Sequence, residues 1–154
     1  MQIIQNKKAY HNYKISNNIE AGLILSGPEV KSIKKGSIDL KGSYIIIDKN
    51  LEPYLINTYI APYKPAKIYQ QKYNPLQDRK LLLNKKQLKF LVGKQQEKKT
   101  SILPLKIYLK NNLIKLEIGI GTGKKKFDKR EDIKKRDFER RKRGLIKNLT
   151  HHLL

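Results

Sequence analysis

The sequence predicts a mainly β protein: a small antiparallel barrel with two to three short helices and a basic C-terminal tail. Three observations predict this class. Short apolar runs alternate with polar residues, turn-forming residues separate these runs, and a long charged segment follows the last run. We therefore expect a compact body over residues 1–122 and a tail over residues 123–154.

The strands are predicted from residue alternation and from the turns between them. The expected strands cover residues 11–15, 19–25, 44–47, 51–56, 102–110 and 113–120. A turn is expected at residues 16–18, and Asn111-Asn112 is expected to make a tight hairpin turn. Gly22 suggests a bulge or a close backbone approach, and Pro53 implies an edge strand. Residues 61–75, rich in Pro and Tyr, are expected to form a long polar loop.

Two helices are predicted from their end signals. The first is capped by Ser26 or Gly27 and stops at Gly36, which can adopt the left-handed conformation that ends a helix. The second begins after Asn84, with Gln87 reaching back as in a capping box, and it runs to about residue 93 or on towards 98.

Composition restricts the possible partners. The net charge is +22, so a polyanion is expected to offset it, with nucleic acid the first choice and an anionic membrane surface the second. The absence of Cys removes disulfides and thiolate sites. No apolar run approaches the length of a membrane span, and the N-terminus has no signal-peptide core. A cytoplasmic protein without a membrane partner is expected.

An enzymatic reading finds few candidate groups. The three His residues, His11, His151 and His152, are too few and too scattered for a triad or a His-rich metal site. The glycines of residues 119–124 superficially suggest a phosphate loop, but the required pattern fails. We expect no catalytic residue, no metal and no cofactor. The sequence does not exclude a catalytic pair of carboxylates that the fold brings together.

Binding has more support. Basic residues occur together at 79–80, and they are combined with aromatic residues or glycine in residues 106–108 and 123–127, a pattern suited to phosphates and unpaired bases. Tyr59 and Tyr108 could stack on unpaired bases, and a position in the hydrophobic core suits them equally well.

The tail has the composition of a helix that no core supports. Residues 124–143 contain twelve Lys or Arg and five Asp or Glu, and only three apolar residues. Acidic residues precede basic residues by four positions in Glu131–Lys135, Asp132–Arg136, Asp137–Arg141 and Glu139–Arg143. We expect this segment to be disordered when free and to fold as a helix on a polyanion, while a solvated tail that only aids solubility is the alternative.

Several motifs occur in the same order as in a known family. They lie in residues 6–13, 20–23, 27–33, 42–44, 75–84, 104–105 and 123–130, and the match covers roughly residues 6–137. Together they resemble the SsrA-binding proteins (small protein B) of bacterial trans-translation. The resemblance implies an oligonucleotide-binding-type (OB-like) barrel and a non-enzymatic RNA-binding adaptor.

The resemblance also implies partners and site residues. The protein would bind the tRNA-like domain of transfer-messenger RNA (tmRNA) as a monomer, and deliver it with elongation factor Tu to a stalled ribosome. The residues that match or neighbour family contacts to tmRNA are Glu20, Lys31, Arg79, Lys80, Leu82 and Lys115. The tail would enter the empty mRNA channel of the small subunit. The residues that match contacts near the decoding centre are His11, Gly123, Lys124, Lys125, Asp128, Lys129, Arg130 and Ile133.

Three alternatives remain open from the sequence. A structural or general rRNA-binding ribosomal protein would share the charge and the barrel. An RNA-processing enzyme would need a metal or a general-base cluster. A membrane-surface role for the tail would need a larger apolar face than the tail has.

Overall fold

The computed structural model describes residues 1–124, 130, 133–141 and 143, and the chain divides into two units, residues 1–123 and 124–154. The strands of the first unit are β1 (Ile4–Gln5), β2 (Tyr13–Leu23), β3 (Ile38–Asp39), β4 (Tyr44–Ile47), β5 (Pro53–Ile56), β6 (Tyr59–Ile60), β7 (Arg79–Leu82), β8 (Thr100–Lys110) and β9 (Leu113–Gly123). Its helices are α1 (Lys7–Asn12), α2 (Gly27–Lys34), the 3-10 helix η1 (Lys64–Gln70) and α3 (Lys85–Gln96). No helix among the described residues is both long enough and apolar enough to cross a membrane.

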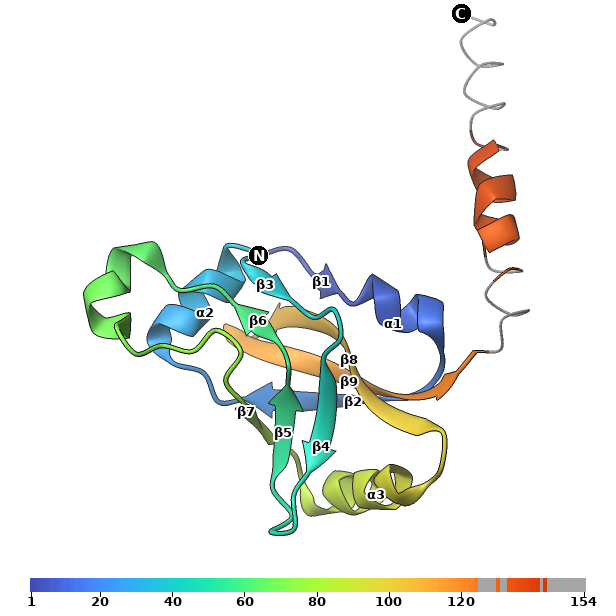
Figure 1. Ribbon diagram of the computed structural model, residues 1–154, viewed down its shortest axis with the longest axis horizontal. Helices are drawn as coiled ribbons and strands as arrows, with labels where there is room; N and C mark the ends of the chain where they lie inside the picture. The colour runs from blue at the N-terminus through green and yellow to red at the C-terminus, as the bar shows by residue number, and fades with distance from the viewer. Residues whose placement is uncertain (125–129, 131–132, 142, 144–154) are drawn as a thin grey trace, which may run out of the picture. The chain divides into compact units, whose positions relative to one another are not determined.

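The main sheet contains seven antiparallel strands in the order β1-β8-β9-β2-β7-β5-β4 (Figure 1). Strands β3 and β6 pair separately. The sheet curls until β4 contacts β8, and its concave side holds the main core. The mainly β class with short helices, predicted from the sequence, is confirmed.

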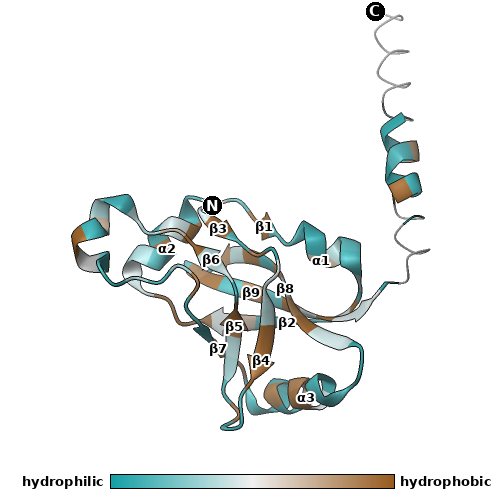
Figure 2. Ribbon diagram, in the orientation of Figure 1, coloured by the Kyte–Doolittle hydropathy of each residue, from teal (hydrophilic) through white to brown (hydrophobic). Residues whose placement is uncertain are grey.

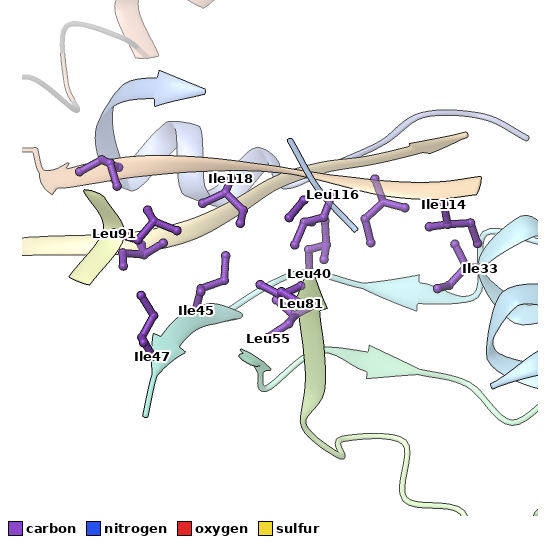
Figure 3. Close-up of a cluster of buried hydrophobic side chains, with 14 of the residues drawn as sticks. Ile33, Leu40, Ile45, Ile47, Leu55, Leu81, Leu91, Ile114, Leu116 and Ile118 are labelled. Atoms are coloured by element: carbon purple, nitrogen blue, oxygen red, sulfur yellow. The ribbon is translucent and has the colours of Figure 1, made fainter. Parts of the chain in front are cut away.

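The core is aliphatic and combines residues of α2 and α3 with residues of the strands (Figure 3). Ile33 of α2 and Leu91 of α3 are fully buried against strand residues such as Leu116 and Ile118. A second, smaller cluster packs Ala9 of α1 against β8. Removing such side chains from water is the main source of stability for a body of this size.

The predicted helix signals act as expected. The hydroxyl oxygen of Ser26 accepts a hydrogen bond from the Glu29 backbone N–H, and the Glu29 carboxylate accepts one from the Ser26 N–H. Asn84 and Gln87 form the same reciprocal pair at the start of α3. Gly36 has φ of +81°, as the stop signal requires.

Some predicted boundaries are wrong at the N-terminal end. Residues 11 and 12 end α1, and the predicted strand at 11–15 is replaced by a β2 that starts at Tyr13. The long-range bond from Asn6 Nδ2 to the Pro104 carbonyl, 2.8 Å, fixes this helix against β8. The predicted turn at residues 16–18 is a bulge within β2, where Asn17 has φ of 56°.

Other corrections concern β5, β9 and the long loop. Strand β5 lies between β4 and β7 and is not at the edge. Pro53 is tolerated because it is the first residue of the strand. Residues 61–75 contain η1 where a loop was expected, and β9 continues to Gly123.

A side chain covers part of the edge of β4. The amide of Gln95 in α3 bonds the Ile47 backbone twice: its Oε1 accepts from the Ile47 N–H at 2.7 Å, and its Nε2 donates to the Ile47 carbonyl at 3.0 Å. Both backbone groups at this point of the edge strand are therefore satisfied within the protein.

Candidate nucleic-acid interface

A row of directly paired residues crosses four strands. Tyr108 of β8 pairs with Lys115 of β9. Lys115 also pairs with Gly22 of β2, which pairs with Leu82 of β7. Directly opposite residues project to the same side of a sheet, and this side faces outward because Leu82 is 54% exposed while Leu81 is 1% exposed. We call the outer surface of β8, β9, β2 and β7 around this row the sheet face.

Glu20 lies on the sheet face within a group of donors. Its carboxylate oxygens accept hydrogen bonds from Lys110 Nζ at 3.1 and 3.4 Å. Hydrogen bonds from Lys110 and Tyr108 lower the pKa of Glu20. Burial, together with the hydrogen bond to Glu20, raises the pKa of Tyr108 to about 12. The face therefore presents an ionised acceptor and a protonated phenol side by side at neutral pH.

The row next to it carries alternating charges. Lys106 pairs with Glu117, and Glu117 pairs with Glu20 across β9 and β2. Two opposite carboxylates repel each other, but Lys106 Nζ lies 3.3 Å from Glu117 Oε2 and Lys110 neutralises Glu20. These ion pairs place the acceptors and the cations next to one another on the sheet face.

Gly22 leaves room for an apolar contact. A Cβ atom placed on Gly22 would lie 3.2 Å from Leu82 Cβ, and the nearest atoms all belong to the Leu82 side chain. The sequence predicts a bulge or a close backbone approach here, but the bulge of β2 lies at residues 16–18, and a side chain makes the close approach to Gly22. Leu82 consequently rests over the backbone of β2 with its outer surface open to solvent. Such a residue can pack on an unstacked base or a ribose.

Lys80 belongs to the same side of β7 as Leu82. Its Nζ lies 2.6 Å from Glu52 Oε2, and both side chains remain about 40% exposed. The hydrogen bond and charge of Glu52 raise the pKa of Lys80. Lys80 therefore stays charged and accessible at the border of the sheet face.

Arg79 points the other way, into the protein, and is only 2% exposed. Its Nε donates to Glu29 Oε2 at 2.8 Å, and its Nη1 donates to the Thr58 carbonyl at 2.6 Å. Its Nη2 donates to the Tyr73 hydroxyl and the Pro75 carbonyl, both at 2.9 Å. All three nitrogens are engaged, so the direct RNA contact predicted for this side chain is not available in this fold. Arg79 instead fastens the segment before β7 to α2.

Lys31 is exposed on α2 and does not belong to the sheet face. Its ammonium group lies 5.4 Å from the centroid of the Tyr63 ring. The predicted tmRNA contacts thus separate into three places: Glu20, Lys115, Leu82 and Lys80 on the sheet face, Lys31 on α2, and Arg79 inside.

The predicted ribosome contacts of the first unit lie near the start of β2. His11 is half-buried in α1, two residues before Tyr13, and Tyr13 pairs with Gly123 at the end of β9. The structure therefore brings His11 close to the point where the tail begins.

In the described part of the second unit, residues 130, 133–141 and 143 are helical, as their residue pattern favours. That the segment is disordered when free and folds on a polyanion stays a prediction. Arg130 and Ile133 are exposed, and Arg143 Nη2 lies 4.0 Å from Glu139 Oε2 as the i,i+4 pattern predicts. Other predicted contacts and pair members lie outside the described residues: Lys125, Asp128, Lys129, Glu131 and Asp132.

The glycine pattern that superficially suggested a phosphate loop has a packing explanation. Gly119 and Gly121 are buried in β9, and Cβ atoms there would lie 2.5 Å from Leu105 Cδ1 and 2.6 Å from Leu103 Cδ1. Only glycine lets β9 pack this closely under the small cluster. Within the described residues, no group of three or more His, Asp or Glu side chains could hold a metal ion.

Sequence reasoning missed the role of Lys110. It lies on β8 ninety residues away from Glu20. A signal exists, because Lys106, Tyr108 and Lys110 alternate along one strand and share one face. The carboxylates that these three side chains contact depend on the order of the strands in the sheet, which the sequence does not give.

Comparisons with known proteins agree with one another. The family model for the SmpB protein matches residues 3–148, further than the resemblance noted above. The SsrA-binding protein of Persephonella marina is 51% identical over 138 residues, covering 90% of this chain and 89% of that protein. The SsrA-binding protein of Bacillus pumilus is 49% identical over 138 residues, with 90% and 86% covered. A solved structure described as "tmRNA-SmpB: a journey to the center of the bacterial ribosome" contains a similar chain, with a TM-score of 0.65 and 39% identity, over 80% of this chain and 85% of that one.

Proposed function

The chain belongs to the SmpB family of SsrA-binding proteins, and on that premise we propose that it is an RNA-binding adaptor for trans-translation. It binds the tRNA-like domain of tmRNA and brings that RNA to ribosomes that have stalled. The family match over nearly the whole chain and the likeness to a chain in a tmRNA-SmpB structure support this function.

The observation that carries the proposal is the environment of Glu20. A protein with a net charge of +22 holds an ionised carboxylate on its outer sheet surface, between Tyr108, Lys110 and Lys115. Lysines alone attract any polyanion, but a carboxylate accepts hydrogen bonds only from amino, imino or hydroxyl donors. Glu20 therefore reads base or sugar donors, Lys115 meets phosphate, and Leu82 packs on an exposed base or ribose.

The second unit and the start of β2 complete the proposal. We assign residues 1–122 to the tmRNA-binding body and residues 123–154 to a tail that enters the empty mRNA channel. His11 and the beginning of the tail would face the decoding centre. The protein acts as a monomer in the cytoplasm, together with elongation factor Tu, and catalyses no reaction itself.

The test is binding to the tRNA-like domain and to an ordinary tRNA over a series of salt concentrations. At low salt any protein of this charge binds both, because counterion release alone gives affinity. We expect the preference for the tRNA-like domain to persist at ~0.2 M salt. If both RNAs dissociate together, the protein is a general rRNA-binding protein.

Two variants test whether Glu20 and Lys115 cause the preference for the tRNA-like domain. Glu20→Ala makes the protein more positive, so nonspecific attraction predicts tighter binding, whereas loss of an acceptor predicts weaker binding. Glu97→Ala removes another lysine-paired carboxylate, at the end of α3, and serves as its control. Lys115→Ala is compared with Lys49→Ala in the exposed β4–β5 turn. We expect Glu20→Ala and Lys115→Ala to weaken binding and both controls to bind nearly as the wild type does.

A further inference from the structure

A second group of basic side chains lies on α2 and at the start of η1. Figure 1 shows the backbone of α2 beside that of η1, drawn in green. Lys31 and Lys35 are one helical turn apart, and their ammonium groups lie 5.4 and 4.9 Å from the centroid of the Tyr63 ring. Lys64 and Lys67 follow Tyr63 and are exposed. We call Lys31, Lys35, Lys64 and Lys67, with Tyr63, the lysine cluster.

The cluster carries charge that the protein does not neutralise. Residues 27–36 and 61–77 contain six Lys and a single acid, Glu29. The carboxylate of Glu29 is buried against Arg79 and faces away from solvent. Within the described part of the chain, no ion pair involves the four lysines of the cluster. In Figure 2 both α2 and η1 are mostly hydrophilic.

Buried contacts hold the segment in place. The Tyr73 hydroxyl donates to Glu29 Oε2 at 3.1 Å, and the hydroxyl of Ser32 in α2 donates to the Ala61 carbonyl at 2.7 Å. Arg79 adds its bonds to Thr58 and Pro75. The segment that supplies Tyr63, Lys64 and Lys67 is thus fixed to α2 at both its ends.

From these observations we infer that the lysine cluster is a second contact with the sugar–phosphate backbone of the same RNA that the sheet face reads. This inference rests on the proposed function. A ring beneath two ammonium groups attracts them and restricts long, mobile side chains. Side chains that are already ordered lose less entropy when they bind a phosphate.

The chemistry of the cluster favours backbone contact over base reading. It offers several ammonium donors and no exposed carboxylate, and Lys binds phosphate as a point charge without selecting a sequence. The sheet face, with Glu20, supplies the selective contacts. The sheet face would select the RNA, and the lysine cluster would add affinity that depends on salt concentration.

The test compares two triple variants with equal loss of charge. Lys35→Gln/Lys64→Gln/Lys67→Gln removes three lysines of the cluster. Lys85→Gln/Lys86→Gln/Lys89→Gln removes three exposed lysines of α3. Affinity for the tRNA-like domain is measured against salt concentration, after urea unfolding shows that both variants keep the wild-type midpoint. We expect the slope of log affinity against log salt to fall by about 2 in the cluster variant, and by less than about half of that in the control.

A further variant, Tyr63→Leu, keeps the charge and removes the ring. We expect it to weaken binding by a few fold without changing the salt slope. Equal slopes for the two triple variants would overturn the inference, as would a cluster variant that binds the RNA normally but binds ribosomes weakly. The wild-type preference between the two RNAs is measured first, so failure of the proposed function is seen separately.

Discussion

Arg79 Nη2 lies 2.7 Å from Glu29 Oε2, and the two side chains are only 1% and 3% exposed. The pair joins β7 to α2 across a gap of fifty residues in the chain. A buried ion pair gains little over two apolar residues, because both charges lose water. Removing only one partner destabilises the fold strongly, because the charge of the other partner remains buried and unpaired.

Arg79→Met should therefore lower the free energy of unfolding by about 3–5 kcal/mol. Lys80→Met, one residue along and on the exposed side of β7, should cost less than about 1 kcal/mol. Urea unfolding followed by circular dichroism measures both. A loss below ~1 kcal/mol for Arg79→Met would show that the pair does not stabilise the fold. Where Arg79→Met remains folded, it should still prefer the tRNA-like domain, as expected of a supporting residue.

The acid stability of the protein should depend on Glu29. Burial alone would raise its pKa, but hydrogen bonds from the Ser26 backbone N–H and Arg79, with the charge of Arg79, lower the pKa below its ordinary value of 4.5. The stabilisation is complete above pH 4.5 and is lost as the pH falls through the folded-state pKa. Glu29→Gln should thus flatten the fall in the free energy of unfolding between about pH 5 and pH 3. Glu97→Gln, at an exposed ion pair, should retain the wild-type slope.

Gly22→Ala should weaken RNA binding by moving Leu82. The added Cβ would lie 3.2 Å from Leu82 Cβ, so the leucine must shift by a few tenths of an ångström. We expect a fewfold loss of affinity for the tRNA-like domain and a change in stability within about 1 kcal/mol. Gly93→Ala in α3, where nothing lies within 4 Å of the new atom, should leave affinity unchanged and stabilise by about 0.5–1 kcal/mol. Equal affinities for the two variants would remove Leu82 from the binding surface.

Truncation after Gly123 should separate RNA binding from ribosome rescue. The cut keeps all of β9 and therefore the pairing of Tyr13 with Gly123. We expect affinity for the tRNA-like domain at ~0.2 M salt to stay within a few fold of the full chain. Peptide tagging on stalled ribosomes should be lost. Tagging that survives the truncation would show that the tail has no part in the process.

The sequence predicts what is decided locally and misses what distant contacts decide. The capping boxes at Ser26 and Asn84 need only the next three residues, and both are found in the structure. The asparagine turn at 111–112 is local as well, with φ of 51° and 62°. Helix α1 was missed because its cap, Asn6, is held by a carbonyl 98 residues away.

The candidate site divides in the same way. The alternation predicted for residues 113–120 puts Lys115 on one face with Glu117, and the structure agrees. Strand β7 was not among the predicted strands, and in the structure its period of two turns Lys80 and Leu82 outward. The same period puts Arg79 on the buried side with Leu81, but a buried arginine requires a partner that only the fold brings to it. Glu20 was predicted from the family resemblance. Its hydrogen-bond partner Lys110 was not predicted, because the order of the strands in the sheet brings the two residues together.

The Gln95 amide, which occupies both backbone groups of Ile47, has a consequence for how copies of this protein behave at high concentration. The unpaired backbone groups of an edge strand are a template on which another polypeptide can extend the sheet, and repeated addition produces aggregates. A neutral side chain from α3 replaces the missing neighbour at that position, without needing a charge there. Self-association through β4 is thereby blocked at Ile47, even when bound RNA cancels the positive charge that otherwise keeps the copies apart.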